Sequence, residues 1–471
     1  MSTLKKAIWF RSDLRTLDNE ALYLACQSKS APEAIFLVCD DTWQRHHWAP
    51  IKQDFLWRTL EVLNEKLAAL GIKLHIKNIG KFSKAGGALR EFCKTHNINK
   101  LYFNAEYALD EKNRDRAVTA VLENDGVEVS KHHGNLLIKP GMVKTQQGEY
   151  YKKFTPFNKR WRAVLAQEID VTPFKPNSFP NINTEPLPNV LLKTQDSSRY
   201  PAGEEAALSK LGQFVGHSVE VYQAGRDRPD QNHTSELSAY LAIGAISPVT
   251  AARALQQFSP EFPYGLPEGP DTWLTELAWR EFYQHLIDFE PRLSKGESFQ
   301  RETNSIQWRD DEKGFAAWCE GKTGYPIVDA GMRQLNETGW MHNRLRMITA
   351  NFLVKDLLID WRKGEAYFMQ NLIDGSFPAN NGGWQWSASV GTDAVPYFRV
   401  FNPVKQSEKF DPQGAYIRKW VKELDSVPDK HIHWPHEWLK NRSNTEYYPP
   451  IVEHKAARER FLTTFKQVKH G

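Results

Sequence analysis

The stretch Asp374-Gly-Ser-Phe-Pro-Ala-Asn-Asn-Gly-Gly-Trp-Gln-Trp386 contains three glycines, two adjacent asparagines and two tryptophans. Glycine and asparagine permit sharp turns and a close approach of the backbone to a ligand. The two indoles add flat walls. This composition predicts a binding site for a planar ring system. An aromatic-rich turn that closes a helical core would have the same composition, and composition alone does not separate the two interpretations.

Two upstream segments carry mixed polar faces. A helical run from Thr338 to Trp361 places Asn343, Arg344 and Met347 on one face, and the segment Trp273–Tyr283 places Glu276, Trp279 and Arg280 at positions i, i+3 and i+4. Polar groups and a thioether do not form a good core stripe. Both faces therefore indicate a site rather than packing, which favours the first interpretation of the stretch 374–386.

Length and composition narrow the class of protein. A chain of 471 residues predicts two or three domains, and a formal charge of +4 permits binding to a polyanion without requiring it. The four cysteines have no CxxC spacing, so neither a zinc site nor an iron–sulfur cluster is expected, and the thiols indicate a reducing compartment. No apolar run approaches the roughly 20 residues that cross a bilayer, so a cytoplasmic protein without a membrane partner is expected.

Hydrophobic patterning predicts an α/β domain with a doubly wound parallel sheet over residues 1–130. The helix predicted from Ile51 to Leu70 should end at the C-cap glycine Gly71. Eight of the 26 prolines lie between Pro140 and Pro201, so residues 131–200 are expected to form a connector, followed by an all-helical domain over 201–471. The predicted strands are Ala7–Phe10, Ala34–Cys39, Ile72–Ile76, Leu101–Phe103 and Val127–Val129.

Longer motifs resemble the cryptochrome/photolyase family, and specifically its bacterial class I cyclobutane pyrimidine dimer photolyases. They include Trp9-Phe-Arg-Ser-Asp-Leu-Arg15, Gly321-Lys-Thr-Gly-Tyr-Pro-Ile-Val-Asp-Ala330 and Ile451-Val-Glu-His-Lys455. The resemblance implies an all-helical FAD-binding domain joined to the α/β domain by the connector. It also implies a monomeric lyase that acts on DNA containing cyclobutane pyrimidine dimers, by light-driven electron transfer from reduced FAD.

The resemblance also assigns the FAD contacts. Thr234, Ser235 and Ser238 lie at a predicted helix start, which by itself is more often a plain N-cap, but the matching family motif holds the FAD phosphates. Asn380 should face the flavin N5 and serve either protonation state by rotating its amide. Glu236 and Ser376 depart from the family pattern, which puts single contacts in doubt. The expected FAD contacts are Tyr222, Thr234, Ser235, Leu237, Ser238, Arg280, Asn343, Arg346, Asp374, Ser376 and Asn380.

Two further functions follow from the resemblance near the flavin. Arg346 and Asp374 would form an ion pair beside the ring, although a purely structural salt bridge would use the same two residues. Trp384, Trp361 and Trp308 match the family's electron-transfer chain from the surface to oxidised flavin. Spacing alone does not order three tryptophans, which are more often core residues. The redox state of the flavin and the rate of repair are left open by the sequence.

A second chromophore is expected in the α/β domain. His46, Asp110, Glu111 and Lys295 match family positions that hold 5,10-methenyltetrahydrofolate as a light-harvesting antenna. A nearby relative's cysteine beside the lysine is Ser294 here. Other family members carry a deazaflavin or a second flavin instead, so the antenna's identity stays open.

The lesion site is expected on the two mixed faces. Trp279 and Trp386 would wall a flipped-out dimer, Glu276 and Asn343 would hydrogen-bond its polar edges, and Met347 would fill the remaining space. Arg226 and Arg344 are the expected phosphate contacts. The (6-4) photolyases place histidines where this chain has Asn343 and Met347. His342 therefore lacks those partner histidines, and we expect it to have a structural role.

The alternative function is a cryptochrome-type blue-light receptor that binds FAD without repair. Three features favour the enzyme over the receptor. They are Asn380, the set Glu276, Asn343 and Met347, and the expected lack of a C-terminal extension.

Overall fold

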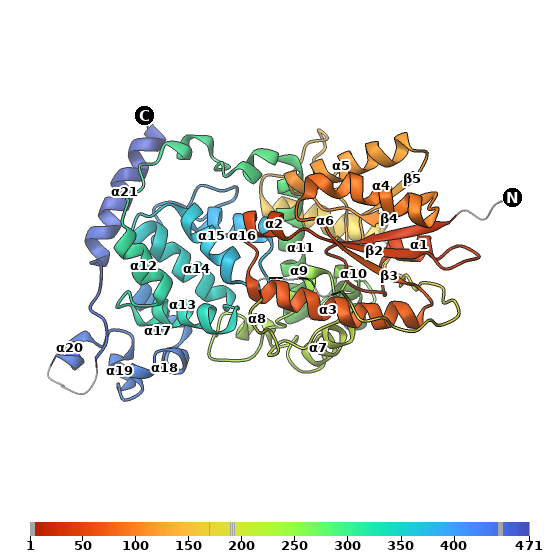
Figure 1. The fold of residues 1–471 in the computed structure, drawn as a ribbon. Coiled ribbons are helices and arrows are strands. Elements are labelled where there is room, and N and C mark those ends of the chain that lie inside the picture. The colour runs from red at the N-terminus through yellow and green to blue at the C-terminus, as the bar shows by residue number, and fades with distance from the viewer. Residues whose placement is uncertain are drawn as a thin grey trace. The chain divides into compact units, whose positions relative to one another are not determined.

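A five-stranded parallel sheet forms the first part of the chain (Figure 1). The structure is a computed structural model and describes residues 5–168, 170–188, 190, 192, 194–440 and 446–470. The strands follow the order β3-β2-β1-β4-β5. Their bounds are Lys6–Phe10 for β1, Glu33–Val38 for β2, Leu74–Asn78 for β3, Lys100–Asn104 for β4 and Glu128–His132 for β5.

The strand order makes the sheet doubly wound. The chain runs from β1 outward to β3, then returns to pair β4 with the other edge of β1. The connecting helices are α1 (Glu20–Ala25), α2 (Asp40–Arg45), α3 (Pro50–Ala69), α4 (Ala85–His96) and α5 (Leu109–Asn124). Residues Ala7 to Phe10 are all buried, as a strand covered on both faces requires. The predicted α/β fold is confirmed, and the strand bounds differ from the predicted ones by at most three residues.

Helix α3 begins and ends as its sequence predicts. Pro50 occupies its first turn, where the missing N–H is not needed. Gly71 has a φ of +75°, and a Cβ there would lie 2.5 Å from the carbonyl oxygen of Pro180. Only glycine satisfies both the left-handed backbone and the close approach.

The described residues after β5 form helices and no further strand element, which confirms the predicted helical second part. The expected connector contains one of these helices, α6. The helices are α6 (Phe154–Glu168), α7 (Glu204–His217), α8 (Tyr222–Gly225), α9 (Ser238–Ile243), α10 (Pro248–Arg253), α11 (Glu268–Phe289), α12 (Glu312–Glu320), α13 (Pro326–Thr338), α14 (Asn343–Asn351), α15 (Trp361–Asn371), α16 (Phe377–Ser387), α17 (Pro403–Phe410), α18 (Ala415–Trp420), α19 (Asp429–Ile432), α20 (His436–Leu439) and α21 (His454–His470).

The chain packs as two compact units. The first comprises the described residues of Met1–Glu220, Ser235–Ser294 and Asp374–Pro378, and the second those of Val221–Thr234, Lys295–Ile373 and Ala379–Gly471. The core of the second unit is rich in aromatic residues, among them Trp318, Trp361 and Trp384. These units describe packing, and the domain boundaries expected near residues 130 and 200 stay a prediction.

The stretch 374–386 is mostly helical, so the prediction of a sharp turn holds only for its first three residues. Helix α16 begins at Phe377, and Pro378 is tolerated because it lies in the first turn. Two adjacent glycines cost about 1 kcal/mol each in a helix. Burial of Trp384, which is 2% exposed, offsets that cost.

The prediction of a single helical run from Thr338 to Trp361 is also wrong. Helix α14 ends at Asn351 and is followed by a π-helical turn over Phe352–Asp356. Leu358 then adopts a left-handed φ of +55°. Asp360 caps α15 by accepting a hydrogen bond of 3.0 Å from the backbone N–H of Arg362. Apolar residues continue through the segment between α14 and α15, so the sequence pattern does not reveal that Asp360 starts a new helix.

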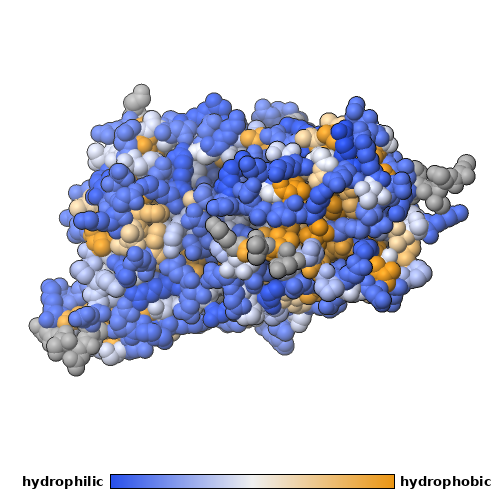
Figure 2. Space-filling model, viewed as in Figure 1, coloured by the Kyte–Doolittle hydropathy of each residue, from blue (hydrophilic) through white to orange (hydrophobic). Residues whose placement is uncertain are grey.

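Within the described part of the chain, no helix combines the length and the apolar character that a membrane crossing needs. Hydrophilic residues cover most of the face shown in Figure 2. All four cysteines are free, and three of them, Cys26, Cys39 and Cys93, are buried as expected.

Glu281 is a buried carboxylate that links three segments of the first unit. It lies in α11 with no exposed surface. It accepts hydrogen bonds from the indole N–H of Trp161 in α6 at 2.7 Å and from the backbone N–H groups of Leu137 and Ile138. Burial raises the pKa of this carboxyl to about 7. The segment after β5 is therefore held to α11 by one side chain.

We predict that Glu281→Leu lowers the free energy of unfolding by at least about 3 kcal/mol, because it leaves three buried donors without an acceptor. Glu281→Gln keeps one acceptor oxygen and should lose less. Urea denaturation of both variants measures the difference. Glu268→Gln, an exposed change in the same helix, is the control, and a loss equal to that of Glu281→Leu in this control would contradict the explanation.

Candidate functional site

Helix α11 presents a half-buried polar face in the first unit. Glu276, Trp279 and Arg280 are half-buried, while Leu277 and Ala278 between them are buried. The indole of Trp279 stacks on the ring of Phe154 with centroids 3.5 Å apart and an interplanar angle of 7°. One face of Trp279 is thereby covered, so only its other face is left for stacking on a ligand.

The segment 234–237 precedes α9 rather than forming its first turn. The helix begins at Ser238, four residues later than predicted, and its N-cap is Leu237. The apolar side chain of Leu237 accepts no hydrogen bond from the first turn. The hydroxyl oxygen of Ser235 instead accepts from the indole N–H of Trp273 at 3.4 Å. The first-turn N–H groups of α9 thus have no side-chain cap.

Glu236 has its charge compensated within the same unit. Its carboxylate forms an ion pair of 2.8 Å with the ammonium of Lys210. Its backbone adopts a left-handed φ of 48°. The departure from the family pattern at this position therefore adds no uncompensated negative charge to the segment that is expected to hold a diphosphate.

Helix α14 presents the second polar face, in the second unit. Asn343 is exposed, and Arg344, Arg346 and Met347 are half-buried. The guanidinium of Arg344 pairs with Asp227 at 2.6 Å and lies 4.3 Å from the ring centroid of Phe410. Arg344 is therefore already held by a carboxylate and an aromatic ring, and a phosphate would have to compete with both.

His342 is the N-cap of α14. Its Nδ1 accepts a hydrogen bond of 3.2 Å from the backbone N–H of Arg344. The ring is 3% exposed, and burial lowers its pKa to about 4. The imidazole is neutral at physiological pH, so it is a poor proton donor. A structural function for His342, as expected from the sequence, agrees with this geometry.

Asn380 is held in one orientation in α16. Its Nδ2 donates a hydrogen bond of 3.0 Å to the backbone carbonyl of Glu365. A carbonyl only accepts, so the amide nitrogen must face it. The side-chain oxygen of Asn380 is left as the end that a ligand meets.

Glu365 is a site residue that the sequence analysis missed. Its carboxylate accepts from Asn381 Nδ2 at 2.9 Å, and Asn381 Oδ1 accepts from Gln385 Nε2 at 2.9 Å. Desolvation raises the pKa of Glu365 to about 7. The residue lies in a segment of ordinary helical composition, and only its pKa and its contacts with the two asparagines reveal it.

The three expected electron-transfer tryptophans belong to one core in the second unit. Trp361 and Trp384 are buried, and Trp308 is half-buried. The ring of Trp384 contacts Phe368, with centroids 4.9 Å apart, and Trp318, at 6.0 Å. A Cβ at Gly364 would lie 2.2 Å from Trp384, so only glycine at this position lets α15 approach the indole.

Three of the four expected antenna residues come together in the first unit. His46 Nε2 lies 2.9 Å from Asp110, and its Nδ1 lies 3.8 Å from Glu111. Both acids occupy the first turn of α5, where the helix dipole favours negative charge. Burial, followed by repulsion from Glu106, raises the pKa of Glu111. Lys295 is exposed and belongs to the second unit.

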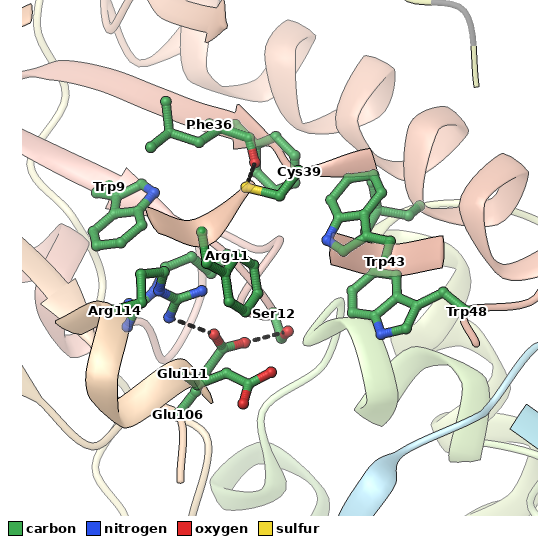
Figure 3. Close-up of a pocket in the computed structure, with 13 residues that line it drawn as sticks. Trp9, Arg11, Ser12, Phe36, Cys39, Trp43, Trp48, Glu106, Glu111 and Arg114 are labelled. Carbon is green, nitrogen blue, oxygen red and sulfur yellow. Dashed lines mark hydrogen bonds and ion pairs between the residues drawn. The ribbon is translucent and has the colours of Figure 1, made fainter. Parts of the chain in front are cut away.

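Glu111 also lines a cavity of about 40 Å³ beyond the ends of β1 and β2 (Figure 3). Figure 3 shows the indoles of Trp43 and Trp48 on one side and the carboxylates of Glu106 and Glu111 on the other. The two indoles stack with centroids 4.9 Å apart. The cavity volume exceeds the roughly 10–15 Å³ that a single water molecule needs, so the cavity has room for more than one water molecule.

The remaining expected site residues are divided between the units. Tyr222 is buried at the start of α8, and the guanidinium of Arg226 lies 5.7 Å from its ring. Asp374 is buried and Ser376 half-buried just before α16, which contains the half-buried Trp386. Arg346 and Asp374 fall in different units, so their ion pair stays a prediction.

Comparisons with known proteins cover both parts of the chain. The profile described as DNA photolyase matches residues 6–177, and the profile described as FAD binding domain of DNA photolyase matches residues 273–467. The chain is 44% identical to the deoxyribodipyrimidine photo-lyase of Vibrio cholerae, over 98% of this chain and 100% of that protein.

Two solved structures share the fold over nearly the whole chain. The archaeal photolyase from Sulfolobus tokodaii, solved with two FAD molecules and implicating a novel light-harvesting cofactor, has a TM-score of 0.82 at 29% identity and covers 98% of this chain and 100% of its own. The cryptochrome of Synechocystis has a TM-score of 0.84 at 27% identity, with the same coverage. The fold and these matches define a flavoprotein of the photolyase/cryptochrome class. Within that class, the chain belongs to the DNA photolyase family.

We predict that Glu365→Gln removes a pH-dependent loss of stability. The folded-state pKa of Glu365 is raised from 4.5 to about 7, so its contribution is fully present below pH 4.5 and is lost as the pH rises to about 7. The variant should unfold at a similar temperature to the parent at pH 5 and should be more stable by about 1–3 kcal/mol at pH 8. Thermal unfolding of the flavin-containing protein measures this, with the exposed Glu302→Gln as control. A pH-independent difference would show that the carboxyl does not titrate in this range.

Proposed function

We propose that this protein binds one FAD and uses light to split cyclobutane pyrimidine dimers in DNA. The observation that carries the proposal is the full-length similarity to the deoxyribodipyrimidine photo-lyase of Vibrio cholerae. The match to the FAD-binding domain of DNA photolyase over residues 273–467 supports the cofactor.

We assign the FAD contacts residue by residue, following the family resemblance. The first-turn N–H groups of α9, which lack a side-chain cap, suit the diphosphate together with Thr234, Ser235 and Ser238. The side-chain oxygen of Asn380 suits a ring N–H. We assign the remaining contacts to Tyr222, Leu237, Arg280, Asn343, Arg346, Asp374 and Ser376. When bound and reduced, FAD supplies the electron that splits the dimer after light is absorbed.

We assign electron transfer to Trp384, Trp361 and Trp308. The burial of the first two and the partial exposure of Trp308 agree with a path that starts in the core and ends near solvent. The packing of all three in one core cluster keeps them rigid. Packing against the neighbouring side chains of this core therefore sets their separations.

We assign lesion binding to the polar faces of α11 and α14 and to Trp386. The uncovered face of Trp279 suits one saturated ring of the dimer, and Glu276 and Asn343 suit its carbonyl and imide groups. Arg226 and Arg344 would contact phosphate, with Arg344 exchanging its pair with Asp227 for the DNA backbone. The low pKa of His342 argues against the proton donation that (6-4) repair requires.

We propose methenyltetrahydrofolate as the antenna, beside His46, Asp110, Glu111 and Lys295. The elevated pKa of Glu111 and its proximity to His46 support a site for hydrogen-bond donors of a pterin ring. The second FAD of the Sulfolobus tokodaii protein is the competing candidate.

We further infer a monomer that acts in the cytoplasm, where its DNA substrate lies. We also propose domain boundaries near residues 130 and 200. The first family profile ends at residue 177, inside the proposed connector, and the second begins at residue 273.

We predict light-dependent repair of dimer-containing DNA and no repair in the dark. Glu276→Ala should lower the repair yield per photon about tenfold or more, since it removes a hydrogen bond to the lesion, while FAD content stays unchanged. Dimer loss in irradiated oligonucleotides measures the yield, and Glu268→Ala on an exposed part of the same helix is the control. A protein with bound FAD and no repair under light would instead be a cryptochrome-type receptor. Reversal of (6-4) photoproducts would contradict the lesion assignment.

We predict that Glu111→Ala abolishes near-ultraviolet absorption by a bound folate. Repair under light that FAD absorbs directly should persist, because the antenna only harvests light. Absorption spectra of the purified variant and parent measure this, with Glu123→Ala, exposed on the same helix, as control. Recovery of a deazaflavin or a second flavin from the parent would refute the folate assignment.

A further inference from the structure

Three side chains with metal-ligating atoms converge on the β3 edge of the sheet, away from the residues assigned above. Their ligand atoms, one each from Glu33, His75 and His96, all lie within 4.8 Å of one another. The three residues come from β2, β3 and α4. His75 follows Glu33 by 42 positions and His96 follows His75 by 21, so no short sequence motif indicates the cluster.

The sheet register explains why two of them meet. Ile35 of β2 pairs with His75 of β3. Glu33 lies two residues before Ile35 and therefore projects from the same face of the sheet as His75. On α4, Phe92 and His96 are four residues apart and share one helix face. The strand period of two and the helix spacing of four thus bring the carboxylate and both imidazoles together.

Neighbouring side chains hold the three groups in place. Glu33 Oε2 lies 2.9 Å from His75 Nε2, and its other oxygen lies 3.3 Å from the ammonium of Lys5. The ring of Phe92 contacts both imidazoles, with centroid distances of 5.3 Å to His75 and 4.7 Å to His96. The two imidazole centroids are 4.5 Å apart. An anchored carboxylate oxygen and rings packed on an aromatic side chain are the supports that ordered metal ligands use.

We propose that Glu33, His75 and His96 form a binding site for a divalent transition metal of the Zn²⁺ class. Two imidazoles and one carboxylate favour Zn²⁺ over Mg²⁺ or Ca²⁺, which prefer all-oxygen sites. All three residues are half-buried, so solvent supplies the fourth ligand. This proposal does not depend on the proposed function.

Occupation requires a small contraction of the cluster. Bond lengths of about 2.0–2.2 Å set ligand atoms of a tetrahedral site about 3.3–3.6 Å apart, less than the present limit of 4.8 Å. Rotations of half-buried side chains suffice for that change. Lys5 and Lys73 add positive charge near the cluster and oppose a cation. The bound metal would tie the edge strand β3 to β2 and α4.

The competing explanation is a hydrogen-bonded ion pair of Glu33 with His75 and Lys5 in which His96 only packs against the neighbouring rings. The two explanations differ in what His96 does. A metal needs the ring nitrogen of His96, whereas the ion pair needs no contribution from it. His96 is therefore the residue whose replacement separates them.

The test is a titration of the metal-free full-length protein with Zn²⁺ by calorimetry and with Co²⁺ by visible absorption. We expect one ion per chain with tetrahedral Co²⁺ bands, and a thermal unfolding midpoint that rises with Zn²⁺ concentration. His96→Gln and Glu33→Gln should each weaken binding at least about 100-fold, since outer contacts of metal sites alone contribute 10- to 100-fold. His217→Gln removes an exposed imidazole outside the cluster and should bind as the parent does.

Several outcomes would overturn the proposal. They are no saturable Zn²⁺ binding by the parent, unchanged affinity in His96→Gln, or equal losses in His217→Gln. A cobalt–thiolate charge-transfer band would identify a cysteine ligand, with Cys93 one turn before His96 as its first candidate, and would refute the assigned ligand set. Unfolding in the presence of a chelator shows whether the variants fold, because each should then match the parent.

Discussion

The carboxyl ends of β1 and β4 carry a network of buried charges on which the segments after both strands depend. Arg11 pairs with Asp115 at 2.7 Å, and Arg114 pairs with Asp115 and Glu106, each at 2.8 Å. Asp13 accepts from the backbone N–H of Arg11 at 2.6 Å. Removing one member of such a network leaves an uncompensated buried charge, at a cost of about 3–5 kcal/mol. The doubly wound sheet brings these charged residues together. The chain continues outward from β1 to β2 on one side and to β4 on the other, so the segments after β1 and β4 meet at the same edge of the sheet.

In the helical unit, buried carboxylates also join segments that are distant in the sequence. Asp329 in α13 is fully buried and accepts hydrogen bonds from Thr323 at 2.6 Å and from the hydroxyl of Tyr447 at 2.5 Å. Asp356 lies 2.6 Å from His454 of α21. Each carboxylate contacts one side chain that lies about 100 residues away in the sequence, Tyr447 for Asp329 and His454 for Asp356. A helical unit has no sheet ladder to fix distant contacts, so buried polar contacts take part of that function.

Periodicity made the sheet and α3 predictable, because their apolar spacing is regular and α3 has Pro50 in its first turn and Gly71 just after its end. The helix over Phe377–Ser387 was not predictable from its glycines and asparagines, since the burial of Trp384 and the amide contacts that stabilise it are tertiary. His46, Asp110 and Glu111, the expected antenna residues, were found only through family resemblance, and the structure brings them together. Glu365 carries no such signal. Its elevated pKa exists only once the helices enclose it.

Asn380 shows how local geometry restricts a functional hypothesis. A free carboxamide offers either a donor or an acceptor by rotating, which is how the sequence suggested that Asn380 serves a flavin nitrogen. The hydrogen bond from its Nδ2 to the Glu365 carbonyl fixes the amide. Turning the donor towards a ligand would break that bond and set two oxygens against each other, a loss of about 1 kcal/mol or more. The side chain therefore presents its oxygen, which would stabilise a protonated ring nitrogen of a flavin bound as proposed and would disfavour a bare one. Asn381 contacts the Glu365 carboxylate and Gln385 contacts Asn381, so α15 would help to set which protonation state of that ring is favoured.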